Sequence, residues 1–232
     1  MATRQHASAV VFDLDDTLFP ERDYALSGFA AVAKAFTAQL ATPASELFVT
    51  MLTISDGPDR ARVYNALCDE LRARGSLPGN TDSLVQDMVA CHRSHSPRIE
   101  LFPDAERALT RLAGRVRLGI ISDGYLIAQR AKVDALGLRT RVDEIILTDQ
   151  WGRDFWKPHA RAFEEMSARL GVPHSACVYV ADNVAKDFIA PRQLAWQTVL
   201  VRRPGGTYSD LVVPKGGQAD VTLDSLDELR AG

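Results

Sequence analysis

The sequence has few cysteines and no pair of them at close spacing. Cys68, Cys91 and Cys177 lie far apart, and no CxxC motif occurs. Disulfide scaffolds and structural zinc sites both need cysteines in regularly spaced sets, so this pattern excludes both and predicts reduced thiols. The run CHRSH at residues 91–95 lacks a second pair of ligands elsewhere, so we interpret it as a polar helix end.

Long hydrophobic runs and a strong charge imbalance are also missing. No stretch approaches the roughly 20 apolar residues of a membrane span. The net charge of −3 gives no general attraction for nucleic acid or anionic lipid. The polar residues 1–8 lead into a short apolar run, so we expect no secretory signal and a cytoplasmic protein. The sequence carries no signal for the oligomeric state.

What the sequence does contain is an alternation of short apolar runs and segments with helical spacing. Helical spacing is found at residues 105–113, 125–136 and 159–170. The strand-like runs are residues 7–12, 116–121, 144–148, 176–180 and 197–201, with 220–223 as a further edge. Such alternation predicts βαβ units, and hence an α/β fold with a doubly wound, Rossmann-like parallel sheet.

Residues 20–97 interrupt this alternation. They contain no strong strand run, and their spacing predicts four helices at residues 24–40, 44–54, 59–73 and 82–95. An insertion after the first strand lies near the edge of the sheet where ligands bind. We therefore predict an α/β core made of residues 1–19 and 98–232, with residues 20–97 as a small all-helical cap domain.

Three carboxylates stand within four positions directly after the first predicted strand. Asp13, Asp15 and Asp16 repel one another, and a divalent cation such as Mg²⁺ would neutralise that repulsion. A carboxylate can attack phosphorus, and a second carboxyl group can protonate the leaving oxygen and later activate water. The alternative is an acidic loop or helix N-terminus, where Asp is common.

Further polar residues follow the next strands. Ser122 precedes Asp123 and Gly124, a sequence that can offer a hydroxyl and backbone N–H groups to a phosphate, although it could be an ordinary N-cap. Lys157 precedes a helix and could stabilise a phosphoryl group, or could be a solvated lysine. Since the carboxyl ends of parallel strands gather at one edge, the sequence predicts a common site.

A second acidic set follows the fourth predicted strand. Asp182 and Asn183 come directly after the strand, and Asp187 stands a few residues further on. Another carboxylate pair at a strand end fits the remaining ligands of a Mg²⁺ ion, although an N-cap and an exposed Asp would look the same.

Taken in order, these motifs resemble those of the haloacid dehalogenase-like superfamily. They are FDLDDTL at residues 12–18, ISDG at 121–124, WKP at 156–158 and VADNVAKD at 180–187. The resemblance extends over nearly the whole chain, and the insertion between the first two motifs is where the superfamily places a helical cap. It implies a hydrolase whose reaction passes through an aspartyl-phosphate.

The resemblance also implies a role for each acidic residue. Asp13 would be the nucleophile and a Mg²⁺ ligand. Asp15 would be the general acid and base and would lend its backbone carbonyl to the metal. Asp182 would complete the metal ligands. Asp187 and Asn183 would not bind the metal directly but would support the residues that do.

The same resemblance implies the phosphate contacts. Ser122 and Lys157 would hold the phosphate, with Asp123 and Gly124 in the same turn, and Asp187 would hold the lysine.

Three residues bear on the branch within the superfamily. Dehalogenases lack a carboxylate two positions after the nucleophile, so Asp15 favours phosphate chemistry, in which an alkoxide needs a proton. Phosphonatases add a cap lysine, and Lys34 is better explained as a surface residue. Ala181 replaces the usual glycine before the first Asp of the fourth motif, for which we expect a slight backbone shift.

We therefore expect a Mg²⁺-dependent phosphomonoester hydrolase acting on a small phosphorylated metabolite, with sugar phosphates or nucleotides favoured. Two alternatives stay open. A phosphomutase or phosphotransferase would share the first motif, and a non-catalytic sensor would bind a phosphorylated ligand without turnover.

Overall fold

The computed structural model describes residues 7–77, 79–203 and 212–230. The chain divides into two compact units, one of residues 1–21 with 99–232 and one of residues 22–98. Residues 1–6, which carry most of the polar start on which the secretory prediction rests, lie outside the described residues. Within the described residues, no helix combines the length and apolarity needed to cross a bilayer.

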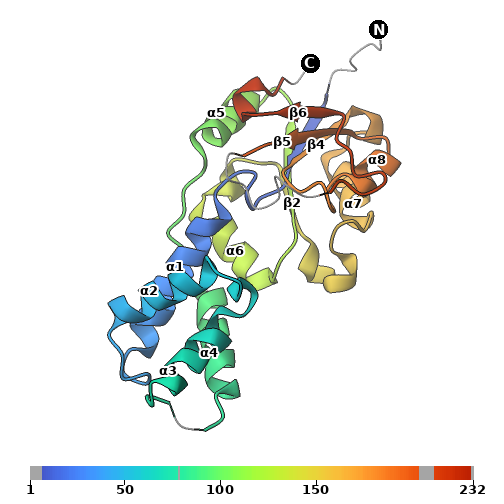
Figure 1. The fold of residues 1–232 in the computed structure, drawn as a ribbon. Coiled ribbons are helices and arrows are strands. Elements are labelled where there is room, and N and C mark those ends of the chain that lie inside the picture. Colours follow the sequence, from blue (N-terminus) through green and yellow to red (C-terminus); the bar gives the residue numbers. More distant parts are fainter. Residues whose placement is uncertain (1–6, 78, 204–211, 231–232) are drawn as a thin grey trace. The chain divides into compact units, whose positions relative to one another are not determined.

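The larger unit is built on one parallel sheet of six strands in the order β3-β2-β1-β4-β5-β6 (Figure 1). The strands are β1 Ala9–Phe12, β2 Arg117–Ser122, β3 Glu144–Leu147, β4 Cys177–Ala181, β5 Gln197–Val201 and β6 Val221–Leu223. This is the doubly wound order in which the chain changes direction beside the first strand. The predicted α/β class with a Rossmann-like parallel sheet is confirmed.

The strands are apolar on both faces because helices cover the sheet on both sides. The helices of this unit are α5 Pro103–Leu112, α6 Leu126–Ala135, α7 Arg161–Leu170 and α8 Ile189–Gln193. Val11 of β1 and Tyr179 of β4 pack with Phe163 of α7 in one buried cluster. All four residues of β1 are buried, and alternate side chains of a strand point to opposite faces.

The smaller unit is entirely helical within its described residues. Its helices are α1 Glu21–Phe36, α2 Ala44–Ser55, α3 Val63–Ala73 and α4 Asp82–Ser94, the first of which begins at the boundary. Leu47, Met51, Leu67 and Met88 are fully buried in a core of its own.

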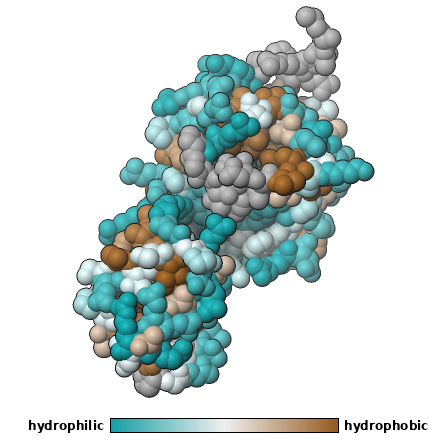
Figure 2. Space-filling model, viewed as in Figure 1, coloured by the Kyte–Doolittle hydropathy of each residue, from teal (hydrophilic) through white to brown (hydrophobic). Residues whose placement is uncertain are grey.

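Hydrophilic side chains cover most of the visible face of each unit, with hydrophobic ones in limited patches (Figure 2).

Some predicted element bounds are wrong. The continuous helix predicted over residues 59–73 is a short 3-10 turn, Arg60–Arg62, followed by α3, because the backbone of Arg62 leaves the helical region at φ −138° and ψ 41°. Ser122 and Ala181 are the last residues of β2 and β4, whereas the apolar pattern ended each strand one residue earlier.

Candidate active site

The sheet register brings the carboxyl ends of three strands together. Phe12, at the end of β1, lies opposite Ile120 of β2 and Val180 of β4. Asp13 follows β1 and Asp182 follows β4, so their side chains lie at one edge of the sheet. This is the edge at which open α/β sheets bind their ligands, beside the point where the strand order reverses.

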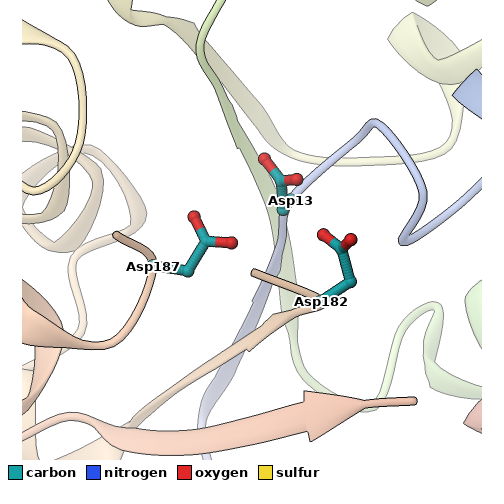
Figure 3. Close-up of side chains that lie close together, drawn as sticks. All are labelled: Asp13, Asp182 and Asp187. Atoms are coloured by element: carbon teal, nitrogen blue, oxygen red, sulfur yellow. The ribbon is translucent and has the colours of Figure 1, made fainter. Parts of the chain in front are cut away.

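Three carboxylates meet at this edge (Figure 3). Asp13, Asp182 and Asp187 each offer an oxygen, and these oxygens all lie within 4.8 Å of one another. Figure 3 shows the carboxylates of Asp13 and Asp182 close together beyond the ends of their strands, with that of Asp187 on the other side of Asp13. Carboxylate oxygens at this spacing are the donors that a hard divalent cation such as Mg²⁺ prefers.

The electrostatics of the cluster fit such a cation. Burial raises the pKa of Asp13 to about 7, although Lys157 acts in the opposite direction. Burial and the charge of Asp13 raise the pKa of Asp182 to about 9. Without an ion, both carboxyl groups therefore hold their protons more strongly than usual, and a divalent cation bound here would stabilise their charged forms instead.

Lys157 contacts two of the three clustered carboxylates. Its Nζ donates to Oδ1 of Asp13 at 2.6 Å and to the hydroxyl of Tyr179 at 2.9 Å, and it forms an ion pair with Asp187 at 2.7 Å. Its side chain is fully buried. Burial alone would lower the pKa of Lys157, but Asp13 and Asp187 outweigh it and raise that pKa well above the usual value.

Sequence reasoning missed Tyr179 because it stands in the middle of an apolar strand. Its side chain is fully buried and its ring packs edge-on against Phe163 at 4.9 Å. Its hydroxyl nevertheless reaches Lys157 and the backbone carbonyl of Ile121. A buried Tyr hydroxyl needs a polar partner, and that requirement was the available signal.

The carboxylate of Asp123 links the turn after β2 to the segments that follow β3 and β4. It accepts hydrogen bonds from the hydroxyl of Thr148 at 2.8 Å and from the backbone N–H of Lys157 at 3.1 Å. It also forms an ion pair with Lys186 at 2.9 Å, another residue that the sequence pattern did not identify. In the same turn, the buried hydroxyl of Ser122 donates to the backbone carbonyl of Asp123 at 3.4 Å.

Gly124 and Asn183 shape the two turns around the site. Gly124 adopts a φ of +123°, and a Cβ there would lie 2.5 Å from Nε2 of Gln129, so only glycine fits without a shift. Asn183 accepts a hydrogen bond from the backbone of Ala185 at 3.0 Å, and its own N–H donates to Asp187 at 3.1 Å. The turn after β4 thus holds Asp187 in place.

Asp15 takes partners different from those of Asp13. Its Oδ1 forms an ion pair with Lys132 at 2.6 Å, and its Oδ2 accepts from Gln129 at 2.6 Å. The chain turns just after it, since Asp16 adopts a φ of 53° and caps the backbone of Glu21 at 2.9 Å. The charge of Asp15 is the chief reason that the pKa of Glu21 is raised to about 7.

Several known proteins resemble this chain in sequence or in fold. A family model described as haloacid dehalogenase-like hydrolase matches residues 7–194. A glyceraldehyde 3-phosphate phosphatase of Methanocaldococcus jannaschii is 28% identical, over 95% of this chain and 94% of the relative. A ribulose-1,5-bisphosphate 5-phosphatase of Halopiger xanaduensis is 27% identical, over 96% and 98%. The crystal structure of a HAD phosphatase from Thermococcus onnurineus shares the fold, with 22% identity, 95% of each chain covered and a TM-score of 0.58.

Proposed function

The chain belongs to the haloacid dehalogenase-like hydrolases, and within that family we propose that it is a Mg²⁺-dependent phosphomonoesterase with Asp13 as nucleophile. The observation that carries the proposal is the buried arrangement around Lys157. Its ammonium group contacts both Asp13 and Asp187, while Asp182 completes a cluster within 4.8 Å. A fixed positive charge beside a reactive carboxylate is what phosphoryl transfer requires.

A magnesium ion would be held by Asp13 and Asp182, with Asp187 beside them and the backbone carbonyl of Asp15 as a further ligand. When bound, it would offset the negative charge of the phosphoryl group and of the carboxylates. Lys157 and the Ser122 hydroxyl would hold the phosphoryl oxygens. Lys157 contacts Oδ1 of Asp13, and we assign the attack to Oδ2.

In the first step, Oδ2 of Asp13 attacks phosphorus in line with the ester oxygen. The bond from phosphorus to that oxygen breaks, and the proton of Asp15 passes to the departing alkoxide. The products are a free alcohol and an aspartyl-phosphate on Asp13, with Asp15 ionised.

In the second step, a water molecule attacks the same phosphorus. Asp15 takes its proton, and the bond from phosphorus to Asp13 breaks. Inorganic phosphate leaves, Asp13 regains its carboxylate and Asp15 regains its proton, so the cycle closes. A carboxyl group at position 15 serves both steps, which a sensor without turnover would not need.

For the substrate we propose a small sugar phosphate. The relatives named for glyceraldehyde 3-phosphate and ribulose 1,5-bisphosphate cover nearly all of this chain, the helical unit included. We assign residues 22–98 the role of a cap that selects the leaving group, because the insertion directly follows the first strand.

The test is turnover of a panel of sugar phosphates, nucleotides and phosphorylated acids with Mg²⁺, for wild type, Asp13→Asn and the exposed control Asp154→Asn. We expect wild type and the control to release inorganic phosphate and Asp13→Asn to be inactive. Undiminished activity of Asp13→Asn would reject the nucleophile. An isomeric phosphoester in place of inorganic phosphate would identify a phosphomutase, and tight binding without turnover would identify a sensor.

A further inference from the structure

Two side chains from a single helix donate hydrogen bonds to the carboxylate of Asp15. Nζ of Lys132 lies 2.6 Å from Oδ1, and Nε2 of Gln129 lies 2.6 Å from Oδ2. Both residues are on α6, three positions apart, a spacing that puts two side chains on the same helix face. Each oxygen of Asp15 therefore has its own donor, which fixes the plane of the carboxylate as well as its position.

Both donors are buried although neither is apolar. Lys132 is 3% exposed and Gln129 is 2% exposed. A buried ammonium group carries a large desolvation cost unless it is paired, and Asp15 is its ion-pair partner at 2.6 Å. The ammonium also lies 5.7 Å from the centre of the Phe19 ring, on the loop that follows β1. A lysine that only solvates the surface lies on the exposed face of its helix, as Arg130 of α6 does, whereas Lys132 is buried.

Gln129 ties Asp15 to the second motif. Its Nε2 donates to the backbone carbonyl of Asp123 as well as to Asp15, and it packs so closely on Gly124 that a Cβ there would collide with it. Its Oε1 is buried and accepts no hydrogen bond from the described residues. Leaving a buried acceptor without a hydrogen bond costs free energy. The hydrogen bonds that Nε2 donates to Asp15 and to the carbonyl of Asp123 therefore determine the orientation of the amide.

We propose that Lys132 and Gln129 are positioning residues that hold the Asp15 carboxyl group in the orientation needed for both proton transfers. The inference rests on the proposed function, in which Asp15 is the general acid and then the general base. Without Lys132 the carboxyl group would rotate, and each step that uses its proton would slow. A step that needs no proton would be unaffected.

The two steps can be separated by the choice of leaving group. p-Nitrophenolate leaves without a proton, whereas an alkoxide such as that of glycerol phosphate needs one. For both substrates kcat/KM reports formation of the aspartyl-phosphate, and kcat also includes its hydrolysis. A defect in the orientation of Asp15 should therefore leave kcat/KM for p-nitrophenyl phosphate nearly unchanged. It should lower kcat for both substrates and kcat/KM for glycerol phosphate.

The experiment compares wild type, Lys132→Met, Lys132→Arg and the control Arg130→Met, which removes the same charge from the exposed face of α6. We expect Lys132→Met to lower kcat/KM for glycerol phosphate by about 10- to 100-fold. With p-nitrophenyl phosphate it should give a burst of p-nitrophenol, followed by slow turnover. Lys132→Arg should recover part of the loss, and Arg130→Met should behave as wild type.

A second comparison keeps the test valid if Lys132→Met folds poorly. Lys132→Met is combined with Asp15→Asn, which removes both charges of the pair. If Lys132 acts through Asp15, the double variant should turn over as slowly as Asp15→Asn alone and no slower. Equal losses of kcat/KM on both substrates, or fully additive losses in the double variant, would overturn the inference. A wild-type chain that hydrolyses neither substrate would instead reject the proposed function.

Discussion

Replacing Lys157 by methionine should strongly destabilise the larger unit. Its ammonium group contacts Asp13 at 2.6 Å and Asp187 at 2.7 Å, and both Lys157 and Asp187 have fully buried side chains. Removing one partner of a buried pair leaves an uncompensated charge and costs about 3–5 kcal/mol. Since domains of this kind are stable by about 5–15 kcal/mol, Lys157→Met should fold only marginally in metal-free buffer.

The structure also predicts how the loss depends on Asp187. Lys157→Met combined with Asp187→Asn removes charges of both signs, so the double variant should be more stable than the sum of the single losses predicts. We expect a coupling free energy of about 1–3 kcal/mol. Lys34→Met makes the same chemical change on the exposed face of α1 and should cost less than about 0.5 kcal/mol.

The assay is urea unfolding followed by tryptophan fluorescence at constant pH, with a chelator present. All three tryptophans, at positions 151, 156 and 196, belong to the larger unit, so the signal reports the unit that holds the site. A loss below about 1 kcal/mol for Lys157→Met, or additive losses with Asp187→Asn, would refute the reasoning that these charges depend on each other.

Three further predictions concern Asp182, Gly124 and Leu67. In metal-free buffer, stability should fall as pH rises from 3.8 toward about 9, because folded Asp182 keeps a proton that the unfolded chain loses. Asp182→Asn should reduce the fall of melting temperature with rising pH. The same fall in this variant as in wild type would contradict the assignment to Asp182. Gly124→Ala should lower thermal stability by about 1–3 kcal/mol and lower activity, because its Cβ meets Gln129. Gly137→Ala, with open space around it, should cost less and keep activity. Leu67→Ala should cost the helical unit about 2–5 kcal/mol in circular dichroism melts, and a smaller loss would argue against its separate core.

The sequence predicted the sheet, and the strand ends to within about one residue, because both depend on local patterns. Fully buried parallel strands are short apolar runs, and acidic residues directly after them gather at one edge whatever the details of packing. The positions of Asp13 and Asp182 at adjoining strand ends therefore followed from the order of the motifs. The roles of these residues stay proposals.

The partners of the acidic groups could not be predicted in the same way. Lys132 pairs with Asp15 across 117 positions, and nothing in local spacing separates a buried lysine from a solvated one. Tyr179 looked like a core residue, and its packing is that of one, but its hydroxyl also reaches Lys157. Such contacts depend on how the helices pack on the sheet, which the hydrophobic pattern constrains only loosely.

The central claim is that Asp13 becomes covalently bonded to phosphorus. The direct measurement is mass spectrometry of the chain after acid quenching during turnover of p-nitrophenyl phosphate with Mg²⁺, followed by peptide mapping. The account predicts one added phosphoryl group on the peptide that contains Asp13, absent in Asp13→Asn. A phosphoryl group on any other residue, or rapid turnover with no covalent species at any quench time, would contradict it.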